Sequence, residues 1–155
     1  MELRQLLKSH PTFEVASDRK RDVLAAAMQI VSVPAGQTII EQGQPGEGLY
    51  LLMEGTARTT QKDDDAGLLL TKELGEGDLF GLLGLVPDMP SSATVTAVTG
   101  VRAAMLSRYA FEQLFASAPA LARQLQYMVA IQLARALQER NRALRTLLRR
   151  NIAAA

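Results

Sequence analysis

Cysteine and tryptophan are absent from this chain, and phenylalanine and tyrosine are few. Without cysteine there is no disulfide, thiolate zinc site, iron–sulfur cluster or cysteine nucleophile. No stretch approaches the roughly 18–20 apolar residues that a membrane-spanning helix requires, and the opening MELRQLLKSHP lacks the apolar core of a signal peptide. These absences favour a cytoplasmic protein with a core of Leu, Val, Ile, Ala and Met.

Groups suited to catalysis or metal binding are also scarce. The only histidine, His10, stands beside Pro11 without partners at ligand spacing. No serine lies in a nucleophile-elbow pattern, and no two carboxylates show the spacing of partners in acid–base catalysis. The run 63–65 is all aspartate but lacks the alternation and closing glutamate of a calcium loop, so we predict a solvated hairpin tip. We therefore expect that this chain is not an enzyme and that it binds no metal ion or cofactor.

The 155 residues are enough for one domain with a sizeable core, and the first 30 or so are predicted to be helical. Leu3, Leu6 and Leu7 share one face of a short helix that ends at His10, because the following proline disfavours α geometry there. Ser17 is a suitable N-cap for a second helix.

From about residue 31 to 106 the chain reads as short strands separated by glycine-rich turns. Alternating apolar residues at Val95 and Ala97 indicate a half-buried strand, and strands spaced about ten residues apart are typical of a sandwich, roll or barrel. The predicted strands are Thr38–Glu41, Leu49–Met53, Thr56–Thr60, Leu68–Leu74, Thr94–Thr99 and Val101–Leu106.

The remainder is predicted to form a short helix at Arg108–Ala116 and a long one from Pro119 to about Asn151. This divides the chain into residues 1–116 and a helical segment, 117–155. The long helix has an imperfect 3-4 seam, which we interpret as the interface of a parallel homodimer; packing against its own roll is the alternative. The seam residues are Ala130, Leu133, Leu137, Arg140, Leu144 and Leu147, with Asn151 next in line.

Two glycine-punctuated segments carry a resemblance to a known family. The segment PAGQTIIEQGQPGEGLYLLMEGTAR, residues 34–58, resembles the entry strands of the cyclic-nucleotide-binding domain family. The segment GEGDLFGLLGLVPDMPSSATVTA, residues 75–97, resembles its phosphate-binding cassette. The resemblance implies an α+β fold: an eight-stranded antiparallel β-roll of the jelly-roll type, with N-terminal helices and a long C-terminal dimerisation helix.

The cassette defines the candidate ligand site. A turn at Phe80-Gly81 opens a short helix whose free N–H groups can face an anion, and small glycines permit close backbone approach. The candidate residues are Phe80, Gly81, Leu82, Leu83, Gly84, Ser91, Ser92, Ala93 and Thr94.

The resemblance also implies two specific side chains, and this chain has neither. Leu82 stands where the family has a glutamate for the ribose hydroxyl, and Ser91 where it has an arginine for the cyclic phosphate. The loss of two hydrogen bonds involving charged groups weakens binding by roughly 3–6 kcal/mol, or about 10²- to 10⁴-fold. Cations on predicted strands could replace the arginine only by facing inward, although such side chains are usually solvated. They are Arg58, Lys62, Lys72 and Arg102.

Positive charge is concentrated at the C-terminal end, where residues 135–151 hold six arginines and one glutamate. The helix dipole, an anionic partner such as nucleic acid, or a further domain or protein each explain it. Transcription factors of the family continue past the long helix into a winged helix-turn-helix. This chain stops at Ala155, so we expect no sequence-specific DNA binding from it.

Three functions follow in order of preference. The first is a non-catalytic regulatory or sensor module whose altered pocket uses another ligand, nucleotide-like or not, or which acts through a protein partner. The second is a working sensor of cyclic AMP or cyclic GMP that holds phosphate through backbone N–H groups, Ser91 and Ser92. The third is a DNA-associated regulator that uses the basic helix.

Overall fold

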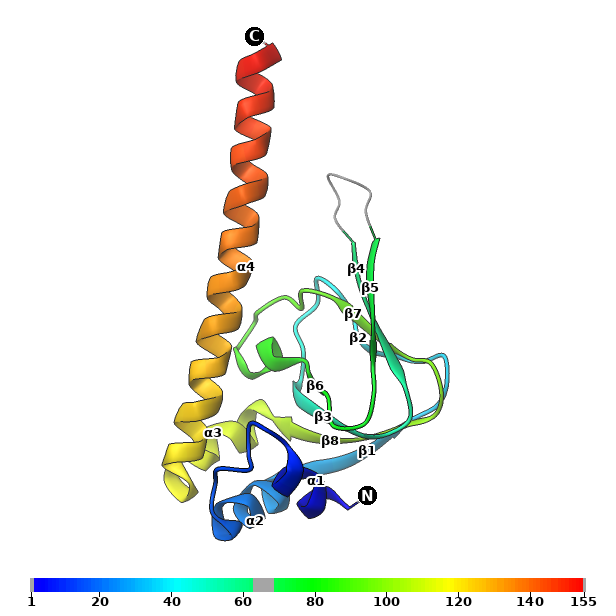
Figure 1. The fold of residues 1–155 in the computed structure, drawn as a ribbon, viewed down its shortest axis with the longest axis vertical. Coiled ribbons are helices and arrows are strands. Elements are labelled where there is room, and N and C mark those ends of the chain that lie inside the picture. The colour runs from blue at the N-terminus through cyan, green and yellow to red at the C-terminus, as the bar shows by residue number, and fades with distance from the viewer. Residues whose placement is uncertain (1, 63–68, 155) are drawn as a thin grey trace.

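In the described part of the chain, eight antiparallel strands form two four-stranded sheets, and a long helix extends from the roll that they make (Figure 1). The computed structural model describes residues 2–62 and 69–154. One sheet has the order β1-β8-β3-β6 and the other β2-β7-β4-β5. The strands are β1 (Gln29–Val33), β2 (Thr38–Ile40), β3 (Gly48–Glu54), β4 (Ala57–Lys62), β5 (Leu69–Leu74), β6 (Leu79–Phe80), β7 (Thr94–Ala97) and β8 (Val101–Ser107).

The sequence pattern explains the central strands. β3 is apolar on both faces and is buried from Gly48 to Met53, because one face meets the roll interior and the other meets the helices. In β7 only Val95 and Ala97 are buried, as their alternation predicts. The α+β fold and its antiparallel β-roll are therefore confirmed.

The first strand corrects the prediction that the helical region extends to about residue 30. The second helix ends at Ala27, where the N–H of Met28 bonds back to carbonyls of the last turn. β1 then starts at Gln29 and pairs with β8 through Gln29 and Met105. A neighbouring strand thus overrides the local helical pattern at Ile30.

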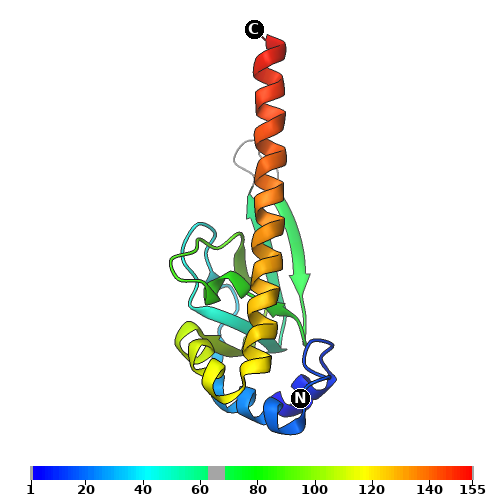
Figure 2. The same ribbon diagram turned by 90° about the vertical axis from the view of Figure 1, so that its left-hand side faces the viewer.

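Helices cover the outside of the β1-β8-β3-β6 sheet (Figures 1 and 2). The predicted N-cap is present: the Ser17 hydroxyl accepts from the N–H of Lys20 at 3.3 Å. Ser107 caps the third helix in the same way, accepting from Ala110 at 3.1 Å. These helices are α1 (Leu3–Ser9), α2 (Asp18–Ala27) and α3 (Arg108–Ser117), and the cassette holds a short 3-10 helix, η1 (Leu82–Leu85).

The long helix α4 (Pro119–Ala154) changes character along its length. Leu121, Ala122, Leu125 and Val129 are buried against the rest of the fold. From residue 137 onward every described side chain is exposed, and the helix runs beyond the roll (Figure 2). None of the described helices has the length and apolar character needed to cross a membrane.

Candidate ligand pocket

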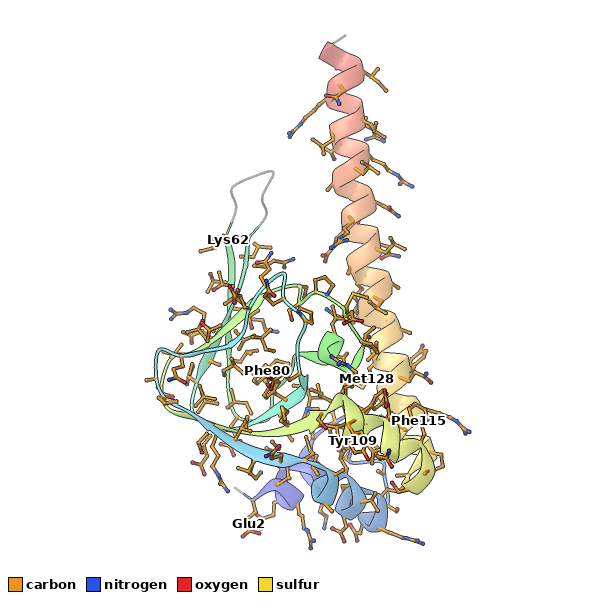
Figure 3. All side chains as sticks on the ribbon, turned by 180° about the vertical axis from the view of Figure 1, so that it is seen from behind. Glu2, Lys62, Phe80, Tyr109, Phe115 and Met128 are labelled. Carbon is orange, nitrogen blue, oxygen red and sulfur yellow. The ribbon has the colours of Figure 1, made fainter. Side chains whose placement is uncertain are left out.

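A pocket of about 270 Å³ opens between the roll interior, η1 and α4. Figure 3 shows Phe80 inside the roll and Met128 on α4 beside η1. Its walls come from β2, β3, β4, β6, β7, the cassette and one face of α4. The lining residues are Ile40, Leu49, Thr59, Leu79, Phe80, Gly81, Leu82, Leu83, Gly84, Ser91, Ser92, Ala93, Val95, Met128 and Gln132.

Two glycines fix the position of η1 in the pocket wall. Gly81 has the left-handed backbone φ of 76°, which side chains disfavour, and it turns the chain into η1. Gly84 lies so close to β3 that an added Cβ would stand 2.6 Å from the carbonyl oxygen of Gly48. The cassette can therefore pack directly on the β3 backbone only because both positions lack a side chain.

The rest of the cassette is tied to the loop that precedes β3. The N–H of Ser91 donates to Gln44 at 2.8 Å, and the carbonyl of Ser91 accepts from Gly43 at 2.9 Å. Arg108 adds a second tie, because its Nη2 donates to the carbonyls of Gly46 and Gly84 at 2.9 and 3.3 Å. These hydrogen bonds tie both Ser91 and η1 to the loop between β2 and β3.

Every residue of the predicted cassette site lines the pocket except Thr94. The Thr94 hydroxyl instead accepts a hydrogen bond from the N–H of Gln42 at 3.0 Å. Thr94 therefore pins the β7 strand to the loop after β2 and does not face the pocket.

Sequence reasoning missed the polar residues Thr59 and Gln132, together with several apolar ones. Thr59 is one threonine among neighbours on β4, and nothing in that pattern marks it as a pocket residue. Met128 and Gln132 reach the pocket because α4 packs back across η1. Their i, i+4 spacing places them on one helix face, but only the packing of α4 shows which face that is.

No Asp, Glu, Lys, Arg or His of the described chain lines this pocket. The strand cations that might have supplied a charge are all exposed. Arg58 pairs with Glu73 at 3.4 Å, and Arg102 pairs with Glu54 at 3.3 Å, both on the outside of the roll. The idea that one of them faces inward is therefore wrong.

Aromatic packing supports the floor of the pocket. The rings of Tyr50 and Phe80 stack with centroids 5.0 Å apart and planes inclined by 6°. Burial, reinforced by the nearby Glu47 carboxylate, raises the pKa of the Tyr50 phenol. Tyr50 is thus a core residue of the roll, and its buried position favours the neutral phenol.

The remaining candidates lie apart from the pocket. His10 accepts from the N–H of Thr12 through Nδ1 at 3.1 Å, and burial lowers its pKa. No cluster of potential metal ligands occurs among residues 2–62 and 69–154, and the predicted aspartate tip at 63–65 lies outside them.

The predicted seam on α4 divides in two. Leu133 is half-buried and packs against the core of its own fold. Ala130, Leu137, Arg140, Leu144 and Leu147 are exposed.

Comparison with known proteins agrees with this geometry. A sequence model described as "Cyclic nucleotide-binding domain" matches residues 30–118, which span β1 to α3 and include the whole cassette. The chain belongs to the cyclic nucleotide-binding domain family. The family resemblance expected from the glycine pattern is thereby confirmed.

Relatives in this family are regulatory proteins. A cAMP-dependent protein kinase regulatory subunit of Aspergillus fumigatus is 36% identical over 121 residues, which cover 78% of this chain and 29% of that protein. The chain therefore spans less than a third of that relative's length. As expected for a non-catalytic module, these relatives are regulatory subunits and regulators rather than catalytic enzymes.

Solved structures of the family superpose on most of the chain. Catabolite activator protein of Thermus thermophilus matches with a TM-score of 0.71 and 29% identity, covering 84% of this chain and 62% of that one. The regulatory subunit of a cAMP-independent protein kinase A from Trypanosoma brucei matches with a TM-score of 0.64 and 27% identity, covering 83% and 49%. The cyclic nucleotide-binding fold is thus shared by proteins described as cAMP-dependent and as cAMP-independent.

Proposed function

We propose that this chain is a non-catalytic regulatory module whose pocket responds to a ligand other than a cyclic nucleotide. The observation that carries the proposal is the uncharged lining of the pocket, which includes Leu82 and Ser91. The sequence resemblance aligns these two residues with the family's glutamate and arginine. A phosphate placed there would lose its water without meeting a counter-charge. The regulatory relatives support a regulatory function, and the uncharged lining of the pocket supports a ligand other than a cyclic nucleotide.

The competing function is a cyclic nucleotide sensor that holds phosphate through backbone N–H groups and the two serines. The number of donors is limited, because the N–H of Gly84 already donates to the carbonyl of Gly81 at 2.9 Å. The hydroxyls of Ser91 and Ser92 remain at the pocket wall. Neutral hydroxyls give weaker hydrogen bonds to phosphate than an arginine does. A cyclic nucleotide sensor of this kind would therefore have to bind the phosphate through few and weak contacts.

Calorimetric titration with cyclic AMP and cyclic GMP separates these functions. We expect dissociation constants above about 1 mM for both nucleotides. The two missing charged contacts weaken binding by roughly 10²- to 10⁴-fold relative to a micromolar site that has them. Micromolar binding of either nucleotide would overturn the proposal.

The double variant Leu82→Glu with Ser91→Arg tests the assignment of these two positions. It should bind cyclic AMP at least tenfold more tightly than the unmodified chain, since each substitution returns a charged partner to the pocket wall. Leu82→Glu with Ser92→Arg is the matched control, because it has the same net charge with the arginine one residue away. Equal binding by both variants would show that the register is wrong.

We also propose that α4 pairs with the α4 helix of a second copy. The part beyond residue 136 carries large apolar side chains that the roll does not cover. Because Leu133 packs on its own core, the exposed seam runs along a neighbouring face of the helix, and its residues are Tyr127, Ala130, Ala134, Leu137, Asn141, Leu144 and Leu148. They keep the 3-4 spacing of a two-stranded coiled coil, with one polar position at Asn141.

A further inference from the structure

The four polar side chains that line the pocket are not used by the fold. Thr59, Ser91, Ser92 and Gln132 supply three hydroxyls and one amide to the wall. In the described part of the chain, no hydrogen bond holds any of these four side-chain groups; the bonds of Ser91 noted above are made by its backbone.

Other polar side chains of the roll do form hydrogen bonds within the fold. Gln42 uses both ends of its amide on the backbone of Lys62, donating at 3.0 Å and accepting at 2.9 Å. The Thr99 hydroxyl accepts from the N–H of Thr56 at 2.9 Å. Gln42 and Thr99 thus hold parts of the roll together, whereas the four side-chain groups on the pocket wall have no such bond among the described residues.

The wall between these polar groups is apolar. Ile40, Leu79, Phe80, Val95 and Met128 face the same space, and the pocket volume of about 270 Å³ is at the small end for ligand sites. A carboxylate, phosphate or ammonium group entering it would be desolvated without an opposite charge. A neutral polar group would find hydroxyl and amide partners that can both donate and accept.

From these observations we infer that the pocket binds a small uncharged molecule with an apolar body, whose neutral hydrogen-bonding group is read by the amide of Gln132. This inference rests on the proposed function and names the ligand class of the same pocket. Gln132 is the one polar side chain that α4 contributes to the lining, so it joins ligand recognition to the long helix.

A matched set of aromatic probes tests the charge requirement: benzamide, benzoate and benzamidine have similar shapes but are neutral, anionic and cationic at neutral pH. Amide resonances of Gly81, Gly84 and Ser91 report occupancy in ¹H–¹⁵N spectra. Benzamide should bind saturably with a dissociation constant on the order of 1 mM, as expected for a fragment of this size. Benzoate and benzamidine should bind at least tenfold more weakly.

Gln132→Leu tests the role assigned to the amide. It should weaken benzamide binding at least tenfold, because the apolar replacement keeps the packing but not the hydrogen bond, and it should not improve benzoate binding, because the lining still lacks an opposite charge. Gln138→Leu, at an exposed position farther along α4, is the matched control and should leave binding unchanged.

Different results would overturn the proposed function and the ligand class inferred here. Benzoate or benzamidine binding as tightly as benzamide, no benzamide shift at all, or an unaffected Gln132→Leu variant would each overturn this inference while leaving the cyclic nucleotide result intact. Micromolar binding of cyclic AMP would overturn the proposed function, whatever the probes show.

Discussion

At the scale of single residues, Gly84 and Arg108 shape the pocket through their contacts with backbone atoms. Gly84 allows η1 to pack against the backbone of β3, and Arg108 donates hydrogen bonds to the carbonyls of Gly46 and Gly84. The Nε atom of Arg108 is buried without a partner among the described residues, and the hydrogen bonds of its side chain come from Nη2. The geometry of the cassette therefore depends on backbone approach more than on side chains.

Replacement of Gly84 by alanine tests this dependence. The new Cβ would meet the carbonyl oxygen and the nitrogen of Gly48 at 2.6 and 2.8 Å, and these are strand backbone atoms that cannot rotate away. We expect a loss of about 1–3 kcal/mol in the free energy of unfolding, as for overpacked cores, measured by urea denaturation. Gly100→Ala is the control because its added Cβ meets nothing within 4 Å. Equal stability of both variants would contradict the close packing of η1 on β3.

At the scale of elements, the strength of the sequence signal decided what could be predicted. β3 was predictable from its apolar run, and α2 from the cap at Ser17. β6 has two residues, Leu79 and Phe80, which is too short for any periodicity, and β1 exists because β8 pairs with it. The pocket face of α4 was hidden for a similar reason, since Gln132 is identified only by how α4 crosses η1.

The seam on α4 is a prediction at this same scale. Leu137→Asp with Leu144→Asp should convert a dimer into a monomer by light scattering, because both residues are exposed, at 61% and 56%, and both lie in the proposed seam. Ala143→Asp with Thr146→Asp adds the same charge on another face and should leave the mass unchanged.

A single substitution distinguishes the exposed seam, which contains Leu148, from the seam expected from sequence, which contains Leu147. Leu148→Asp should weaken the dimer more than Leu147→Asp does. The reverse order would support the seam first expected from sequence.

At the scale of the whole molecule, charge is divided between the two ends. Residues 135–151 carry a net charge of +5, so the rest of the chain carries −4 within a total of +1. In the described structure, all six arginines of this segment are exposed and none forms an ion pair. The projecting half of α4 therefore presents an unneutralised basic surface on a weakly acidic body.

This division predicts weak, salt-sensitive attraction to DNA without sequence preference. Binding of an arbitrary duplex, followed by fluorescence anisotropy, should fall more than tenfold between about 50 and 200 mM salt, because only phosphate contacts and counterion release drive it. Arg142→Gln with Arg149→Gln should flatten the salt dependence by removing two such contacts. Arg58→Gln with Arg102→Gln should not, since those arginines lie on the roll and are paired with Glu73 and Glu54. Tight binding that persists at high salt and distinguishes one duplex from another would instead support a DNA-associated regulator, because phosphate contacts alone carry no sequence information.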